Sequence, residues 1–256
     1  MPRSVAIVTG ASQGIGRATA VRLARDFDAI VLVARSRAPL EAVAEQIRAP
    51  GTEVLVIGAD LADPPAPAQL VETVVARFGR IDALLNIAGA VPPDDLFAMT
   101  DEQWDAGLAL KLHGARRLTI AAWPALRKSR GSVVLIAGNS AEMPKAKQAA
   151  VGTINAAIVA LAKAFAGRGL EDGVQVNSVL PGAVMTSRRR ALLEQWALLH
   201  DVSIEEADAQ FPRRAGIDRY GRPEEIAELM AFLVSPSASW LTGSALRMDG
   251  GEIKAV

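Results

Sequence analysis

Short apolar runs alternate along the whole chain with longer segments whose apolar residues recur every three to four positions. Runs of four to seven apolar residues suit strands buried on both faces, and the three-to-four period suits helices packed on one side. The alternation predicts strand–helix–strand units and a parallel sheet. Seven strands are expected, at residues 5–9, 29–33, 53–58, 83–87, 132–137, 175–180 and 245–248.

Helices are expected between these strands, and nothing in the sequence divides the chain into parts. Their predicted ranges are 15–26, 40–48, 68–78, 101–127, 153–166 and 224–233. No repeat or low-complexity tract interrupts the pattern, and the proline-containing stretch 63–67 is too short for an interdomain linker. The fold class is therefore α/β: one Rossmann-type doubly wound domain over residues 1–256 with a seven-stranded parallel sheet.

One long segment, residues 182–219, has no strand pattern. Helical patterns around 191–199 and 204–211 are interrupted there by charged stretches. The segment follows the sixth strand, and ligands of open α/β sheets bind outside the carboxyl ends of the strands. We expect a lid-like insertion over the ligand, with a contact between subunits as the alternative.

Composition and charge narrow the classes of partner. Half of the residues are hydrophobic and only 4% are aromatic, so Val, Ile, Leu and Ala must build the core. Lys plus Arg equals Asp plus Glu, 28 against 28, which gives no electrostatic basis for binding nucleic acid or an anionic membrane. The arginine run 188–190 is the local exception: we expect a solvated stretch, with a patch for phosphate or an acidic partner as the alternative.

Cysteine is absent, and the two histidines cannot form a metal site, so no metal is expected. The first strand begins at once, without the features of a signal peptide, and no segment looks long and apolar enough to span a bilayer. The expectation is a soluble, cytoplasmic protein that acts on a small molecule.

The first strand is followed by a glycine-rich turn and then a helix, with glycine at positions 10, 14 and 16. Such a turn lets the backbone approach a pyrophosphate, and the N–H groups at the start of the helix attract that anion. A carboxylate after the second strand would bind a ribose diol, but this chain has Arg35, which suits a ribose phosphate. The sequence therefore predicts NADP as the preferred cofactor, with NAD as the alternative.

Motifs along essentially the whole chain resemble those of the short-chain dehydrogenase/reductase family. They are the turn TGASQGIG, the pair Asp60-Leu61, the segment Asn86-Ile87-Ala88-Gly89, then Pro181-Gly182 with Thr186, and a carboxyl-terminal signature that ends at Asp249-Gly250-Gly251. The resemblance implies an oxidoreductase and a homotetramer or dimer. It also implies cofactor contacts from Gly10, Ser12, Gln13, Gly14, Ile15, Gly16, Arg35, Asp60, Leu61, Asn86, Ala88, Gly89, Pro181, Gly182 and Thr186.

The catalytic Ser, Tyr, Lys and Asn of that family are replaced in this chain. Gly138 stands at the Ser position and Val151 at the Tyr position, and the one tyrosine, Tyr220, belongs to the carboxyl-terminal signature. In the family the Tyr supplies the proton for carbonyl reduction, the Lys lowers its pKa and the Ser orients the carbonyl. The standard mechanism is not available, and a larger, more apolar pocket is expected.

Two of the replacements look like an exchange, because Lys111 occupies the Asn position and Asn155 the Lys position. We hypothesise that Lys111 restores the positive charge from the opposite helix, orienting the ribose or donating a proton if desolvation lowers its pKa. Unrelated drift after loss of activity is the alternative. Ser140 is the expected substitute for the carbonyl-binding hydroxyl, and the amide of Asn139 could do the same.

Two functions fit these residues. The first is an NAD(P)(H)-dependent oxidoreductase of a carbonyl or alcohol with a non-standard active site. The second is a catalytically silent NADP-binding regulator or oligomer partner. A buried, oriented ionisable group near the nicotinamide site would favour the first, and an all-apolar pocket the second.

Overall fold

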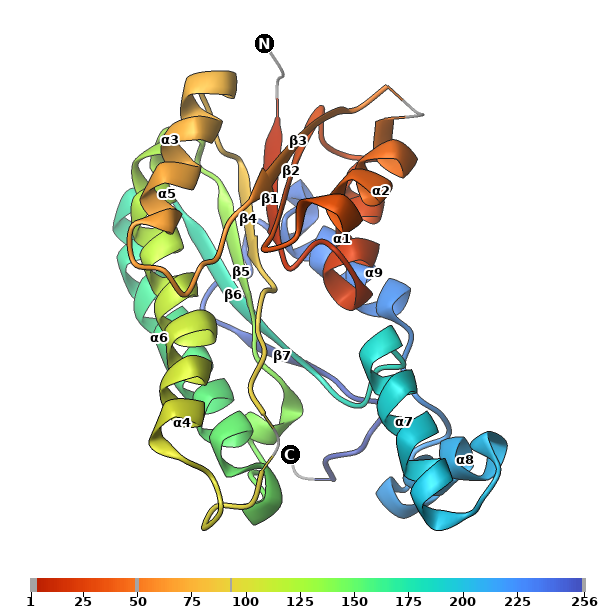
Figure 1. Ribbon diagram of the computed structural model, residues 1–256. Helices are drawn as coiled ribbons and strands as arrows, with labels where there is room; N and C mark the ends of the chain where they lie inside the picture. Colours follow the sequence, from red (N-terminus) through yellow and green to blue (C-terminus); the bar gives the residue numbers. More distant parts are fainter. Residues whose placement is uncertain (1–3, 49–50, 93, 255–256) are drawn as a thin grey trace.

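The computed structural model describes residues 4–48, 51–92 and 94–254. Its seven strands form one all-parallel sheet in the order β3-β2-β1-β4-β5-β6-β7 (Figure 1). The strands are β1 (Val5–Thr9), β2 (Ala29–Ala34), β3 (Glu53–Gly58), β4 (Ala83–Asn86), β5 (Ser132–Ile136), β6 (Gln175–Pro181) and β7 (Ala245–Met248). Each predicted strand is present within one residue at either end, which confirms the predicted α/β class.

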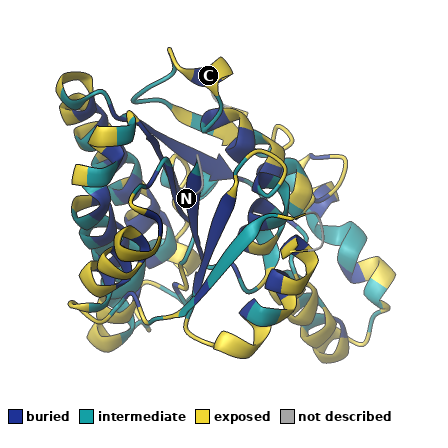
Figure 2. Ribbon diagram, turned by 90° about the horizontal axis from the view of Figure 1, so that it is seen from above, coloured by how far each residue is buried: buried dark blue, intermediate teal, exposed yellow. Residues whose placement is uncertain are grey.

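Helices cover both faces of the sheet because both faces are apolar. In β1, Val5 and Ile7 pack into one core and Ala6 and Val8 into the other, as alternation along a strand requires. Figure 2 shows the central strands buried and the outer helix surfaces exposed. The first core is covered by α3 (Ala66–Phe78), α5 (Ala115–Ser129) and α6 (Ala149–Asp172), and the second by α1 (Gly14–Leu23), α2 (Arg37–Arg48) and α9 (Pro223–Leu233).

The helix expected over 101–127 is not continuous. Between α4 (Asp101–Gly107) and α5 lies a π-helical segment, Leu108–Gly114. Glycines in close contact with neighbouring segments precede it and end it: a Cβ on Gly107 would lie 2.9 Å from the side chain of Ile154, and one on Gly114 2.8 Å from the backbone oxygen of Leu61. The apolar period of the sequence does not show such a segment, which commonly marks a functional site.

Helix α6 is longer than expected, at 24 residues in place of the predicted 153–166. The stretch Ala146–Asp172 is also long and apolar enough to cross a membrane by length and composition, so the expectation that no segment reaches this limit was wrong. Ile158, Ala162 and Ala166 of α6 pack into the core under the sheet. We therefore interpret α6 as a core helix.

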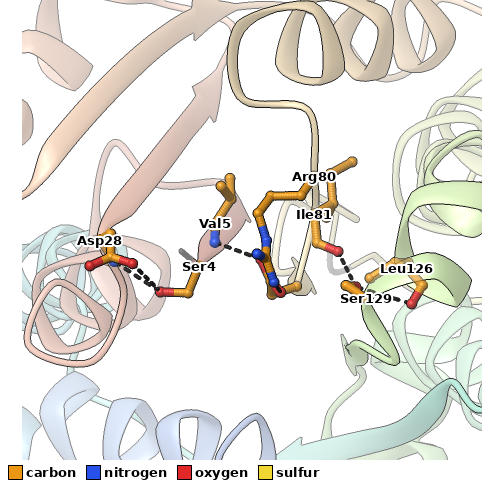
Figure 3. A network of polar contacts seen from close by, with 8 residues as sticks. Ser4, Val5, Asp28, Arg80, Ile81, Leu126 and Ser129 are labelled. Carbon is orange, nitrogen blue, oxygen red and sulfur yellow. Dashed lines mark hydrogen bonds and ion pairs between the residues drawn. The ribbon is translucent and has the colours of Figure 1, made fainter. Parts of the chain in front are cut away.

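The amino ends of the strands are held by polar side chains (Figure 3). The carboxylate of Asp82 accepts a hydrogen bond from the Val5 N–H at 2.8 Å and an ion pair from Arg80 at 2.6 Å. The Ser4 hydroxyl donates to Asp28 at 3.0 Å. These contacts satisfy backbone groups at the amino ends of the strands.

The carboxyl edge contains the point where the order of strands reverses. From β1 the chain first adds β2 and β3 on one side and then returns to add β4 on the other, so β1 and β4 are neighbours. Adjacent connections there leave the sheet in opposite directions and open a crevice, where ligands of doubly wound sheets bind.

The segment predicted as a lid-like insertion contains two helices, α7 (Ser187–His200) and α8 (Ile204–Ala215). Both are longer than the helical patterns expected at 191–199 and 204–211. Thr186 and Ser203 cap them, each accepting a hydrogen bond from a backbone N–H of the first turn. The two helices project beyond the carboxyl edge of the sheet (Figure 1).

Two glycines of α6 provide a test of close packing. A Cβ on Gly169 would lie 2.0 Å from the backbone oxygen of Val174, whereas one on Gly167 meets nothing within 4 Å. We expect Gly169→Ala to lower the free energy of unfolding by about 1–3 kcal/mol or more. Gly167→Ala should raise it by about 0.5–1 kcal/mol, because alanine favours a helix. Urea unfolding measures both, and equal effects of the two variants would contradict this packing.

Candidate functional site

The glycine turn after β1 has the geometry that an anion requires. Gly10 and Gly14 have φ angles of 67° and 54°, which non-glycine residues rarely adopt. A Cβ on Gly16 would lie 2.2 Å from the Gly10 oxygen, so the turn and α1 pack too closely for a side chain. No side chain caps α1 at Gln13. The first N–H groups of α1 therefore have no side-chain cap, as a helix start that binds an anion requires.

The end of β4 is fastened to this turn by one hydroxyl group. Thr9 Oγ1 accepts hydrogen bonds from the N–H groups of Ile87 at 2.8 Å and Ala88 at 2.9 Å. A Cβ on Gly10 would lie 3.0 Å from the Ala88 backbone. Asn86 is buried and donates to Thr119 at 3.1 Å. The structure thus brings the predicted segment 86–89 directly beside the glycine turn.

The start of the predicted lid forms another side of the crevice. Thr186 lies near the turn, since its methyl group is 3.2 Å from where a Cβ of Gly14 would be. Its hydroxyl accepts from the N–H of Arg189 at 3.2 Å and caps α7. Pro181 is buried and the N–H of Gly182 donates to the Met248 carbonyl oxygen. Both therefore lie at the joined carboxyl ends of β6 and β7.

The remaining predicted cofactor residues follow β2 and β3 or belong to the glycine turn. Arg35 is exposed after β2, while the neighbouring Arg37 pairs with Glu41 at 3.2 Å. The carboxylate of Asp60 accepts from a backbone N–H two residues later, and Leu61 is buried. Ser12 and Ile15 are half-buried and Gln13 is exposed.

A hydrogen-bonded chain joins the three residues predicted as catalytic. Lys111 Nζ donates to the Ala137 oxygen at 3.1 Å and to Asn155 Oδ1 at 2.5 Å. Asn155 Nδ2 donates in turn to Ser140 Oγ at 2.8 Å. Lys111 therefore points into the protein, and Asn155, only 2% exposed, lies between it and Ser140. The amide orientation leaves the Ser140 hydroxyl proton free to donate to a ligand.

The environment of Lys111 favours its neutral form. Desolvation lowers the pKa of this lysine from 10.5 to about 8. Its aliphatic stem lies against Gly89, where a Cβ would be 3.0 Å from Lys111 Cδ. Lys111 belongs to the π-helical segment. Because it contacts Gly89 on one side and is linked through Asn155 to Ser140 on the other, it connects the cofactor side of the crevice with Ser140.

Positions 138 and 151 carry no ionisable group into this cluster. A Cβ on Gly138 would lie 2.7 Å from Asn155 Nδ2, so a larger residue there would displace the amide. Val151 is half-buried among apolar residues at the start of α6. Tyr220 is buried elsewhere, stacked on Phe211 with ring centroids 5.5 Å apart.

Other polar groups near the site have varied partners. Asn139 Nδ2 donates to Glu252 at 2.7 Å and Asn139 lines the pocket beside Ser140, so a role of its second N–H toward a substrate stays a prediction. Glu142 forms an ion pair with Arg247. The ring nitrogen Nδ1 of His113 is buried without a hydrogen-bond partner among the described residues. No cluster of metal-binding side chains occurs in the described part of the chain.

A pocket of about 100 Å³ lies beside Ser140. Gly182, which follows β6, Arg189 of α7 and Phe211 of α8 also line it. A larger pocket, of about 210 Å³, is lined by residues such as Asp218, Glu225 and Met248 and contains none of the predicted catalytic residues. We assign the substrate side to the smaller pocket because Ser140 lines it. The sequence drew attention to the arginine run but did not indicate that Arg189 reaches this pocket.

A parallel sheet with a glycine turn where its strand order reverses defines a Rossmann-type dinucleotide-binding fold. The family profile described as "Enoyl-(Acyl carrier protein) reductase" matches residues 10–252. The chain belongs to the short-chain dehydrogenase/reductase family.

Relatives cover nearly all of the chain. The short-chain reductase protein NovJ of Streptomyces niveus is 35% identical over 248 residues, 97% of this chain and 93% of the relative. The 3-oxoacyl-[acyl-carrier-protein] reductase FabG of Staphylococcus epidermidis is 32% identical, over 96% of this chain and 97% of the relative. The structure of L-sorbose reductase from Gluconobacter frateurii, complexed with NADPH and L-sorbose, matches with a TM-score of 0.95 and 30% identity. The match covers 99% of this chain and 97% of the reductase.

The lowered pKa of Lys111 predicts how stability depends on pH. The unfolded chain keeps this lysine protonated up to its ordinary pKa of 10.5, whereas the folded protein releases the proton near pH 8. The cost of burying the charge is therefore fully present below pH 8 and is relieved as pH rises from 8 to 10.5. Over this interval the free energy of unfolding of the wild type should rise by up to about 3 kcal/mol relative to Lys111→Met.

Urea unfolding at several pH values between 7 and 10.5 measures this difference. Lys128→Met, which alters an exposed lysine of α5, is the matched control and should follow the wild type. A constant difference between the wild type and Lys111→Met across this range would show that the lysine is not desolvated.

Proposed function

We propose that this protein is an NADP(H)-dependent oxidoreductase that acts on a carbonyl or alcohol with a non-standard set of catalytic residues. The observation that carries the proposal is the hydrogen-bonded chain from Lys111 through Asn155 to Ser140. It places a buried amine beside the cofactor crevice, where the family's Tyr and Lys are absent. A buried group with a shifted pKa in a crevice is typical of an active site.

The crevice fits a nicotinamide dinucleotide. A Cβ at Gly10, Gly14 or Gly16 would meet neighbouring protein atoms, so only glycine allows this compact turn, and the uncapped start of α1 suits the pyrophosphate. Arg35 suits a ribose phosphate, which favours NADP over NAD. NADPH bound here would supply a hydride for reduction. L-Sorbose reductase, with the same fold, has been solved with NADPH.

In this proposal Ser140 binds the substrate oxygen and Lys111 donates a proton to it. Asn155 Nδ2 donates to Ser140 Oγ, so the Ser140 hydroxyl donates to the carbonyl oxygen. Two N–H groups of the Lys111 ammonium are held by Ala137 and Asn155. The third is available to deliver a proton to the developing alkoxide, and a pKa of about 8 makes that transfer favourable near neutral pH.

A second function is favoured by the absence of a phenol and a serine at positions 151 and 138. Because those groups are absent, the chain would in this case be a catalytically silent NADP-binding regulator or oligomer partner. Lys111 would then serve only to hold Asn155 and the end of β5. NADP(H) binding is common to both functions, so turnover distinguishes them.

Assembly into a homotetramer or dimer in the cytoplasm also belongs to the proposal. Strand β7 is the edge of the sheet, and edge strands are usually covered. Trp240, just before β7, is 98% exposed and Leu170, at the end of α6, is 75% exposed. Apolar side chains of this size support burial by another subunit, whose number light scattering would measure.

The catalytic role of Lys111 predicts a characteristic pH profile. With NADPH and the best ketone of a broad panel, kcat for reduction should fall as pH rises through about 8, because the protonated amine is the acid. Lys111→Met should lower kcat by about 10²- to 10⁴-fold and remove this limb of the profile. Ser140→Ala should also lower kcat, while Lys128→Met should leave it unchanged.

Titration of the same variants with NADPH separates the possible outcomes. A weaker affinity of Lys111→Met for NADPH with unchanged kcat would assign Lys111 to the ribose in place of the proton. NADPH binding without oxidation on any carbonyl would support the silent function. Failure of the wild type to bind NADPH or NADH would contradict both.

Cofactor preference depends in this proposal on Arg35. Arg35→Asp should weaken NADPH binding by about 10- to 100-fold, the usual effect of losing a charged hydrogen bond, and should strengthen NADH binding. Arg37→Ala, two residues away and already paired with Glu41, is the control and should change NADPH affinity little. Fluorescence titration measures both, and an unchanged preference in Arg35→Asp would assign NADP selection to other residues.

A further inference from the structure

The three arginines at the start of α7 have different surroundings. Arg190 pairs with Glu194 at 3.7 Å, and Arg188 is exposed. Arg189 is half-buried and lines the pocket that also contains Ser140. The sequence-based expectation of a solvated stretch is therefore wrong for the middle arginine.

Arg189 is held in place by aromatic rings. Its guanidinium carbon lies 5.7 Å from the ring centroid of Phe211, and Phe211 stacks on the buried Tyr220 at an angle of 17°. Within the described residues Arg189 forms no ion pair. A guanidinium positioned over an aromatic ring keeps its N–H groups available, in a planar arrangement that matches a carboxylate.

The other charged groups of the pocket leave an excess of positive charge. Lys145 is a second cation in the lining, and Glu252 is the one carboxylate there. Glu252 already accepts a hydrogen bond from Asn139. Burial raises the pKa of Tyr220, the charge of Arg189 lowers it and that of Asp208 raises it, so Asp208 lies near this ring, but it does not line the pocket.

The geometry points to a substrate that carries a carboxylate: we propose that Arg189, assisted by Lys145, binds an anionic group while Ser140 receives the carbonyl or hydroxyl. This rests on the proposed oxidoreductase function and names its substrate class. Arg189, Lys145 and Ser140 line the same pocket of about 100 Å³. The substrate class is therefore oxo or hydroxy acids with few bonds between the two groups.

Binding measurements test this assignment without requiring turnover. The NADP⁺-saturated protein is titrated by calorimetry with 3-hydroxybutanoate, 4-hydroxypentanoate and mandelate, each beside its methyl ester. At least one acid should bind about tenfold or more tightly than its ester, as expected for a charge-assisted hydrogen bond. Arg189→Met should abolish that difference, Lys145→Met should reduce it, and Arg188→Met, one residue away on the exposed side, should preserve it.

Equal affinity of acids and esters in the wild type would overturn the assignment, as would equal losses in Arg188→Met and Arg189→Met. A loss of NADP⁺ affinity in Arg189→Met as large as its loss of acid affinity would place Arg189 on a cofactor phosphate and would also overturn it. Acid binding without reduction of the corresponding oxo acids would sustain this inference and reject the proposed function. Efficient reduction of neutral ketones without preference for acids would support the proposed function and reject this inference.

Discussion

The site depends on the contact between the ends of β1 and β4, where Thr9 accepts the two N–H groups that follow β4. These strands are neighbours only because the chain returns to the middle of the sheet after β3. One hydroxyl group therefore fixes the glycine turn against the segment 86–89. Without that contact the crevice would lack one of its walls, and Lys111, which lies against Gly89, would lose its support.

Lys111 provides a positive charge from the π-helical segment, whereas the Lys position of the family, occupied here by Asn155, lies in α6. Lys111 comes from the π-helical segment and Asn155 from α6, and they meet by hydrogen bonding across the site. Gly138 permits this meeting, because any Cβ there would contact the Asn155 amide. The replaced residues thus form one mutually dependent arrangement, in which Gly138 is small because Asn155 occupies the adjacent space.

The segment after β6 contributes in two ways. Thr186 packs against Gly14 and caps α7, which ties the beginning of this segment to the cofactor side of the crevice. Three residues later Arg189 turns toward the pocket beside Ser140. One helix start therefore contacts both the glycine turn and the pocket that we assign to the substrate.

The sequence alone determined the features that depend on neighbouring residues. The seven strands, the glycine turn between β1 and α1, and the alternation of Val5 and Ala6 between the two cores follow from local period and from backbone conformations that only glycine adopts readily. The motif order likewise indicated the family. The comparison of motifs also placed Lys111 and Asn155 on opposite helices.

Tertiary packing decided what the local pattern does not encode. The π-helical segment and the full length of α6 depend on contacts between distant segments, which override helical propensity. The same holds for the Lys111–Asn155 hydrogen bond, between residues 44 apart, and for the inward direction of Arg189 beside two exposed arginines. A side chain's direction and pKa are set by the groups packed around it, and these come from parts of the chain that only the folded structure brings together.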